Sequence, residues 1–303
     1  MKKSIIILSA LFIALTGCAA NELKKEEPVK KSESKPIGPK KRIGVVAFEN
    51  KTKYGERLGS AAADILITEI AKTNRFIVVE REKLDKLIKE EELGMLGITD
   101  PKTATRLGKI LGLNAIVIGS ISQFGVKTVG SDYLVTQSKT QIAEAAVEIR
   151  LVDTDTGQIL YADSGEGIAK STAGQILGLG TRAGYDETIE GNALRSAISR
   201  FVDKIVSSMD KKVWSCRVVH IKAETGDVFI NAGRESNLPL GAVLNIIHPG
   251  QEIKDPATKE IIGYDETPAG KIKTERYFGE DGSVGKMISG SLPAINDMCR
   301  AGK

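Results

Sequence analysis

The chain has 303 residues, of which 41% are hydrophobic and 27% are charged, and its formal net charge is +4. This composition is ordinary for a globular protein, and the length is enough for one large or two modest domains. Because the net charge is small and both signs are mixed, the composition speaks against a nucleic-acid partner.

The N-terminus has the pattern of a bacterial lipoprotein signal. Lys2 and Lys3 precede an apolar run over 5–15, which is too short to span a membrane as a helix. The run ends in Leu-Thr-Gly before Cys18, the arrangement of a lipobox, in which the cysteine thiol carries the lipid. We therefore predict a signal peptide over 1–17 and a covalent lipid, of the palmitate type, on Cys18. An ordinary signal peptide with an incidental cysteine is the alternative.

The residues after Cys18 predict a location at the outer membrane and a flexible tether. Ala19 stands where an aspartate commonly retains lipoproteins at the inner membrane, so the periplasmic face of the outer membrane is favoured. The segment 18–41 is rich in Lys, Glu, Pro and Ser and cannot bury a core of its own. Its lysines could attract anionic lipid headgroups, but the interspersed glutamates favour a solvated linker.

Alternating strands and helices are predicted after Arg42. Short apolar runs indicate buried strands, and apolar residues at helical spacing indicate amphipathic helices. Asp100 and Pro101 form a typical helix start, and Gly112 a typical helix end. In chain order the predicted elements are strand 43–48, helix 56–73, strand 76–79, helix 82–92, helix 101–111 and strand 115–121. This order predicts an α/β layer with right-handed crossovers.

From Gln123 the pattern changes to two long β-hairpins. Alternation over 146–152, a turn at 155–157 and a return strand to Ala162 predict antiparallel pairing. The candidate arms are 121–129 with 133–146 and 162–171 with 175–185, before a last helix over 187–209. Their lengths suit membrane-spanning strands, but charged residues interrupt them, so membrane insertion and two soluble hairpins stay open as alternatives. The candidate membrane-facing apolar residues are Phe124, Val126, Leu134, Ile142, Ile168, Ile176, Leu177 and Leu179.

The sequence predicts an α/β domain over 42–212 and a small β-barrel domain over 213–303. Short runs separated by turns indicate strands at 216–222, 227–231, 242–247, 261–264 and 270–276. Cys216 and Cys299 stand near the two ends of the second domain, and an exported pair of this kind often forms a disulfide. Closing a loop of ~80 residues would stabilise the fold by ~4 kcal/mol on chain-entropy estimates. We predict this disulfide.

The residue pattern does not predict an enzyme. His220 and His248, the only two histidines, lie in or beside predicted strands, without a serine or cysteine nucleophile arrangement. Cys216 and His220 are four residues apart, but no second ligand pair follows at zinc-site spacing. We therefore predict no catalytic residues, no metal and no cofactor other than the lipid on Cys18.

Four stretches between Arg42 and Met209 carry a resemblance to a known family. They are RIGVVAF at 42–48, FIVVEREKL at 76–84, AIVIGSI at 115–121 and VEIRLVDTDTGQIL at 147–160. In their order and spacing they resemble the CsgG family of curli-secretion lipoproteins. The resemblance implies a ring-forming outer-membrane lipoprotein, in which each subunit gives two hairpins to a shared barrel that exports amyloid-like subunits. It thus implies a homo-oligomer with a secreted or envelope protein as its partner.

One departure from this family concerns the pore. The curli-type pore narrows at a loop between the first strand and the first helix, and here that interval spans only 49–55, with Asn50 and Tyr54. The interval is too short to match residue by residue, so no constriction residues are carried over.

The C-terminal part resembles the small SH3-like domain of flagellar T-type assembly proteins, which bind or scaffold. The stretches that carry this resemblance are DVFINAG at 227–233, LGAVL at 240–244, 261–263 and 269–272. The fold class expected is therefore an α/β domain with a mixed sheet, flanking helices and two long hairpins, followed by an SH3-like barrel. The function predicted is an outer-membrane lipoprotein that forms or assists an oligomeric export or surface-assembly complex. The alternative is a pore-free periplasmic adaptor or regulator, like activators of cell-wall synthases or flagellar-assembly proteins.

Overall fold

The structure is a computed structural model. It describes residues 38–55, 57–79, 81–90, 101–133, 136–176, 179–180, 188–257 and 261–302. The predicted signal peptide, Cys18 and most of the predicted tether lie outside these residues. All the described residues belong to one compact unit, Pro36–Lys303, which contains an α/β part and a closed β-barrel.

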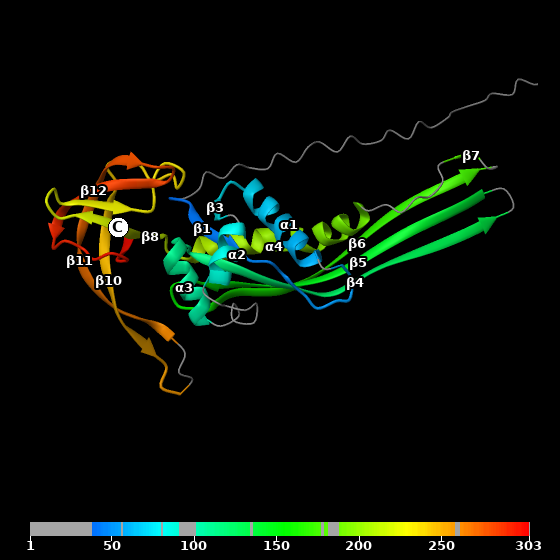
Figure 1. Cartoon of the computed structure of the whole chain (residues 1–303), viewed down its shortest axis with the longest axis horizontal. Helices are drawn as coiled ribbons and strands as arrows, with labels where there is room; N and C mark the ends of the chain where they lie inside the picture. Colours follow the sequence, from blue (N-terminus) through cyan, green and yellow to red (C-terminus); the bar gives the residue numbers. More distant parts are fainter. Residues whose placement is uncertain are drawn as a thin grey trace, which may run out of the picture. The chain divides into compact units, whose positions relative to one another are not determined.

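A mixed seven-stranded sheet forms the centre of the α/β part (Figure 1). Its strands are β1 (Lys41–Val45), β2 (Glu49–Asn50), β3 (Phe76–Val79), β4 (Ala115–Tyr133), β5 (Thr136–Asp153), β6 (Ile159–Ile176) and β7 (Leu179–Gly180). Its helices are α1 (Leu58–Lys72), α2 (Arg81–Glu90), α3 (Pro101–Leu111) and α4 (Thr188–Lys211). The strand order is β3-β1-β4-β5-β6-β7, with β2 paired to β4. Because β1 is parallel to β3 and β4 while β4, β5 and β6 pair antiparallel, the predicted mixed sheet is confirmed.

Hydrophobic cores lie on both faces of this sheet. Successive residues of a strand point to opposite faces. Val117 therefore joins the larger core with α1 and α4, while its neighbour Ile116 joins a smaller core with Leu84 of α2 and Leu107 of α3. The two cores hold β1 and the start of β4 between two layers of helices.

Local sequence explains where the helices begin and end. In α1, Leu58, Ala62, Leu66 and Ile70 are four residues apart and buried on one face. The helix is followed by Asn74, which takes a left-handed backbone with φ of 53°, a conformation common just after a helix. The structure places α3 at Pro101–Leu111, with Gly112 at φ 63° after it, so this predicted helix is confirmed.

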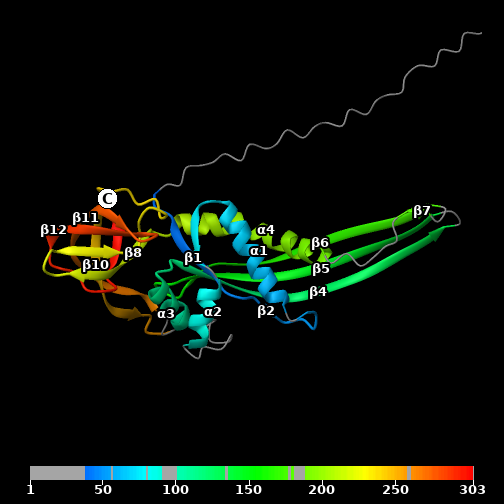
Figure 2. The same cartoon turned by 45° about the horizontal axis from the view of Figure 1, so that its top comes forward.

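The outer strands are longer than the sequence predicted. β4, β5 and β6 contain 19, 18 and 18 residues. Figure 2 shows that they continue beyond the N-terminal end of α4. The turns expected between the arms, near 130–132 and 172–174, are wrong, because Ser131 pairs with Ser138 and Thr172 with Thr140 inside the sheet. Polar residues and glycines were interpreted there as turns, whereas β5 supplies hydrogen-bonding partners to both flanking strands. In the candidate return arm over 175–185, the strand that the structure describes after β6 is β7.

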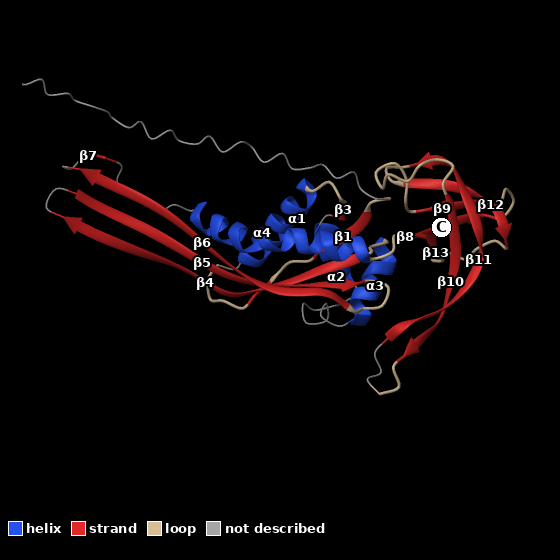
Figure 3. Ribbon diagram, turned by 180° about the vertical axis from the view of Figure 1, so that it is seen from behind, coloured by secondary structure: helices blue, strands red, loops and turns tan. Residues whose placement is uncertain are grey.

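The barrel follows α4 and is closed by six strands, seen in Figure 3. They are β8 (Ser215–Lys222), β9 (Asp227–Ile230), β10 (Val243–Lys254), β11 (Ile261–Phe278), β12 (Gly282–Gly290) and β13 (Met298–Ala301). Their order around the barrel is β10-β11-β12-β9-β8-β13, and alternate residues such as Val218, Val228, Ile230 and Leu244 fill the interior. The predicted small all-β barrel is confirmed, while its SH3-like identity stays a prediction.

Several barrel strands differ from their predicted bounds. The sequence predicted separate strands at 261–264 and 270–276, but both belong to β11. The register with β10 shifts beside Pro268, since Ile246 pairs with Gly270 and Ile247 with Pro268. A bulge of this kind is where a strand tolerates proline. The glycine-rich β12 and the four-residue β13 were not predicted.

Candidate functional site

The outer parts of β4, β5 and β6, over 122–133, 136–146 and 162–176, form a three-stranded sheet that we call the projecting sheet. The face toward α4 begins with small and apolar rows. Phe124 lies beside Ala145, and Val126 beside Ala143, and all four belong to or pack against the larger core. The next row on this face, Thr128 with Gln141 and Ser171, is polar.

Helix α4 approaches β6 unusually closely at Gly165 and Gly167. A Cβ atom at Gly167 would lie 2.1 Å from the carbonyl oxygen of Ala193, and one at Gly165 would lie 2.7 Å from that of Ala197. Any side chain at these positions would push the helix away from the sheet. The glycines therefore set the distance between α4 and the base of the projecting sheet.

The opposite face of the projecting sheet carries charged residues around a shallow groove. Glu144, Glu166, Lys127 and Ile168 line this groove, whose volume is about 410 Å³. Lys127 and Glu144 form an ion pair with a distance of 2.7 Å between Nζ and Oε1, and Ile168 is 58% exposed. This face is thus mixed in character, with single apolar side chains among charges.

A β-bulge divides the predicted membrane-facing residues between the two faces. The register of β4 against β5 shifts between Ile121 and Gln123, and one extra residue reverses the faces of everything beyond it. Phe124 and Val126 therefore turn toward α4, whereas Ile142 and Ile168 lie on the groove side. These candidate residues therefore do not all lie on one face of the sheet.

The remaining predicted site residues lie near the strand ends or outside the described part. Ile176 pairs with Leu179 between β6 and β7. Leu134, Leu177 and Cys18 fall outside the described residues. No helix in the described part of the chain combines the length and apolarity that a membrane-crossing helix requires.

The loop between β1 and α1 packs against β4 at the base of the projecting sheet. Glu49 and Asn50 pair with Ser120 and Ile121 of β4, and the Asn50 side chain donates hydrogen bonds to the carbonyl oxygens of Tyr54 and Gly55, each at 2.9 Å. The Tyr54 ring lies 4.7 Å from the Phe124 ring, centroid to centroid, and its hydroxyl donates to Glu190 of α4. The interval 49–55 therefore lies at the start of the projecting sheet.

Both outer edges of the projecting sheet lack a strand partner among the residues that the structure describes. On β4, pairing with β1 and β2 ends at Ile121, so its outer edge is free from Gln123 onward. On β6, pairing with β7 involves only Gln175 and Ile176. An unpaired edge of this length presents backbone N–H and C=O groups to another chain.

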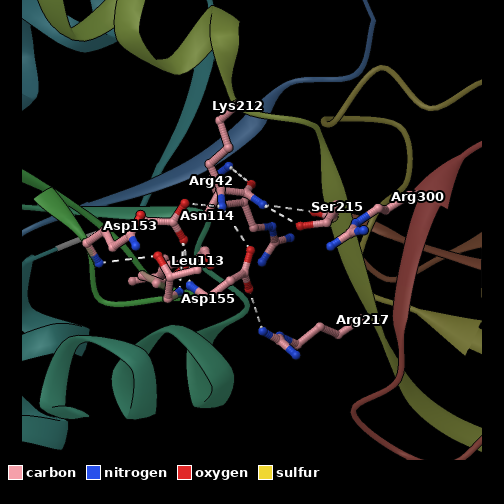
Figure 4. Close-up of polar contacts among 12 residues, drawn as sticks. Arg42, Leu113, Asn114, Asp153, Asp155, Lys212, Ser215, Arg217 and Arg300 are labelled. Carbon is pink, nitrogen blue, oxygen red and sulfur yellow. Dashed lines mark hydrogen bonds and ion pairs between the residues drawn. The ribbon is translucent and has the colours of Figure 1, made fainter. Parts of the chain in front are cut away.

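A second cluster, which we call the polar junction, lies where the α/β part meets the barrel (Figure 4). Lys212 Nζ lies 2.7 Å from Asp153 Oδ2 and 2.8 Å from Asp155 Oδ2, and Arg217 of β8 lies 2.9 Å from the other oxygen of Asp155. The four side chains are at most 15% exposed. Two cations and two carboxylates thus neutralise one another with little access to water.

Arg42 and Asn114 complete the junction on its other side. The Arg42 backbone N–H donates to Asn114 Oδ1 at 2.8 Å, and Asn114 Nδ2 donates to the Ser215 carbonyl oxygen at 3.0 Å. The Arg42 guanidinium lies 2.8 Å from Asp281, which also accepts hydrogen bonds from Ser236. Burial raises the pKa of the Asp281 carboxyl, but these hydrogen bonds outweigh it and hold the pKa below its ordinary value of 3.8.

Two further contacts join the parts. Trp214, the only tryptophan, donates from its indole Nε1 to the Lys40 carbonyl oxygen at 3.1 Å. In the barrel, the long β10–β11 hairpin brings Tyr264 beneath Lys109 of α3, with the ammonium 5.6 Å from the ring centroid. The barrel is therefore held at several separate points.

Neither histidine joins a cluster that suggests catalysis. His248 Nδ1 lies 2.6 Å from Asp297, and the His220 ring stacks edge-on against Phe229 at 5.3 Å. Within the described part of the chain, no group of three or more His, Cys, Asp and Glu side chains is placed to hold a metal ion. The absence of an enzymatic activity stays a prediction.

The structure brings the two predicted disulfide partners together. Cys299 of β13 lies directly opposite Cys216 of β8, and both side chains are buried as free thiols. The disulfide itself stays a prediction.

Sequence reasoning missed the polar junction entirely. Asp155 was interpreted as part of a turn, and Lys212 only as the last residue of the predicted α/β domain. A run of alternating acids followed much later by a lysine carries no local signal of pairing. The one available hint was that these charged residues fall on both sides of a predicted domain boundary.

Comparison with known proteins identifies the family. The family model for the curli production assembly/transport component CsgG matches residues 26–235. The chain belongs to the CsgG family. The match is longer than the resemblance at 42–209, because it begins within the predicted tether and ends inside the barrel.

Relatives of this CsgG-family chain include lipoproteins. A Neisseria meningitidis serogroup B protein named as lipoprotein NMB1126/NMB1164 is 32% identical over 222 residues, which cover 69% of this chain and 95% of the relative. Among solved structures, lipoprotein GNA1162 from Neisseria meningitidis has a TM-score of 0.36 at 14% identity, covering 57% of this chain and 99% of its own. The PelC dodecamer from Paraburkholderia phytofirmans has a TM-score of 0.30 at 12% identity, with 57% and 91% covered. The LpoB C-terminal domain from Escherichia coli has a TM-score of 0.30 at 14% identity, with 43% and 84% covered.

Proposed function

We propose that this chain is a lipoprotein of the outer membrane, anchored on the periplasmic face through Cys18, that assembles with copies of itself into an export or surface-assembly complex. Membership of the CsgG family, whose model is named for curli assembly and transport, supports a role in export or surface assembly. The observation that carries the assembly step is that, among the described residues, both outer edges of the projecting sheet have no strand partner. Each edge is a template on which a neighbouring copy can add a strand.

The projecting sheet is firmly supported at its base, as a shared structure between subunits requires. Phe124 and Val126 are packed against the larger core, and Gly165 and Gly167 hold α4 against β6. The outer rows, such as Thr128 with Gln141 and Ser171, are polar. Strand addition in this outer region therefore leaves the fold of each subunit intact.

Polar rows on both faces of the outer sheet favour a second candidate, a periplasmic adaptor without a pore. A membrane-spanning strand presents one apolar face to lipid. Here Lys127 lies beside Ile142 and Lys170 on one face, and Thr128 beside Gln141 on the other. In the adaptor the sheet lines no channel, and an envelope protein binds elsewhere on the chain.

A truncated hairpin separates the two candidates. Replacing 128–141 by Asn-Gly joins Lys127 to Ile142, which are paired across the strands, through a two-residue turn, and keeps Val126 and Ala143 in the core. The full lipidated chain, extracted in mild detergent, should give oligomers by mass photometry and conductance in planar bilayers. The truncated variant should be monomeric and show no conductance. Monomers without conductance from the unmodified chain would exclude the channel. Retained capture of an envelope partner by the truncated variant would favour an adaptor whose partner binds elsewhere.

The anchor has its own test. Metabolic labelling with a fatty-acid analogue should mark the full chain, and Cys18→Ala should abolish the label and release the protein from sedimented outer membranes. A labelled Cys18→Ala variant would contradict lipidation at this residue.

A further inference from the structure

The register between β8 and β13 places two cysteines face to face. Cys216 pairs with Cys299, between the neighbouring pairs Arg217 with Met298 and Ser215 with Arg300. Directly opposite residues of antiparallel strands have Cα atoms about 4.5–5.5 Å apart. A disulfide needs a Cα separation of about 4.4–6.8 Å, so these strands meet the requirement without moving.

The two thiols also point to the same side of the sheet. Both belong to the barrel core, with exposed fractions of 6% for Cys216 and 0% for Cys299. Burial raises the pKa of the Cys216 thiol well above its usual range, and a hydrogen bond with Cys299 adds to this effect. Inside the closed barrel the two thiols are therefore in contact and shielded from reagents in solution.

We propose that Cys216 and Cys299 form a structural disulfide that fastens β13 to β8 and locks the barrel closed. In its formation the two thiols lose two protons and two electrons, and one S–S bond forms. The electron pair and the protons pass to the disulfide of an envelope thiol oxidoreductase, which becomes a dithiol. This proposal does not depend on the export function, because it requires only that the chain reach an oxidising compartment.

Burial also sets the time at which the bond forms. Thiol–disulfide exchange needs a thiolate and access to it. The closed barrel denies access at both cysteines, and burial raises the pKa of the Cys216 thiol. The oxidation therefore precedes the docking of β13, or accompanies it. Once formed, the bond is protected from reductants by the same burial.

Peptide mapping tests the bond in the unmodified chain. The full chain, exported and alkylated at lysis without reductant, is denatured and digested with trypsin, which cuts after Lys212, Arg217, Lys286 and Arg300. The expected product is peptide 213–217 linked to peptide 287–300, separating into two peptides on reduction. Two alkylated, unlinked peptides from the exported chain would overturn the proposal. The same chain without residues 1–18, retained in the cytoplasm, is the control in which both thiols stay free.

A thermal measurement tests whether the bond fastens the barrel. Reduction under denaturing conditions, followed by refolding, should lower the Tm of the unmodified chain by about 10 °C. The double variant Cys216→Ala with Cys299→Ala should show no change between reducing and oxidising buffer. An unmodified chain whose Tm is equal in both buffers would contradict the locking role.

Discussion

Arg42 and Asp281 form an ion pair across 239 positions of the chain, with 2.8 Å between Arg42 Nη2 and Asp281 Oδ2. Arg42 lies in the first strand of the α/β part, and Asp281 lies immediately before β12 of the barrel. The same carboxylate accepts the backbone N–H groups of Gly233 and Ser236 at 2.8 and 2.9 Å. One buried carboxylate thus organises a barrel loop and ties it to β1 of the sheet.

Replacing Asp281 with Asn should destabilise the protein. The variant leaves the partly buried Arg42 without its opposite charge and weakens the acceptor for two backbone N–H groups, so we expect a loss of about 2 kcal/mol in the free energy of unfolding. Urea unfolding followed by the fluorescence of Trp214, which is 8% exposed at the junction, measures it. Glu280→Gln, an exposed neighbour, is the control and should stay within about 0.5 kcal/mol. Equal losses in both variants would contradict the role of the ion pair.

The same carboxyl predicts an acid limit to stability. Because its pKa in the folded protein lies below the ordinary 3.8, the unfolded chain binds this proton more tightly, and stability falls as the pH falls through the folded value. Above the ordinary value the contribution is complete. Urea midpoints measured from about pH 5 down to about pH 2 should therefore fall more steeply for the unmodified chain than for Asp281→Asn. Parallel curves would show that Asp281 contributes no pH-dependent stability.

Adjacent lysines offer a matched test of the acidic side of the junction. Lys212 neutralises Asp153 and Asp155 and is 9% exposed, whereas Lys211 is exposed. Lys212→Ala leaves two shielded carboxylates with Arg217 alone, and we expect a loss of about 3 kcal/mol. Lys211→Ala should change stability by less than about 0.5 kcal/mol. Thermal unfolding by circular dichroism compares the two, and a reversed order would contradict the assignment.

Two glycines of the outer strands should respond differently to the same substitution. A methyl group at Gly167 would collide with the backbone of Ala193, while at Gly125 it would meet nothing within 4 Å. Gly167→Ala should therefore lower stability by about 1–3 kcal/mol, and Gly125→Ala should change it by less than about 0.5 kcal/mol. Urea unfolding provides the comparison. Equal stability of the two variants would mean that α4 shifts freely over β6.

Elements with local signals were predictable from the sequence, and those fixed by distant partners were not. Helix α3 has Pro101 at its start and Gly112 after its end, so its bounds were predicted correctly. The bulge near Ser122 has no such signal, yet it moves Phe124 to the face opposite Ile142. Without the extra residue, both would share one face, as the alternation of the sequence suggested. One local irregularity thus changed the interpretation of the candidate site.

The polar junction shows the same limit in a different way. Its residues come from the end of β5, the end of α4 and the start of β8, and each is unremarkable in its own segment. Only the packing of the barrel against the α/β part brings Asp155 and Arg217 within 2.9 Å. Sequence reasoning predicted the two parts but had no means of predicting the contact between them.

The position of β13 between β8 and β10 makes closure of the barrel depend on the strand that follows all the others in the chain. Residues 298–301 follow every other barrel strand in the chain, yet both of their neighbours depend on them. A product stopped short of Met298 would leave two strand edges and an apolar interior open to water. Such a product would be a ready substrate for proteases, so the barrel protects the chain only when β13 is in place.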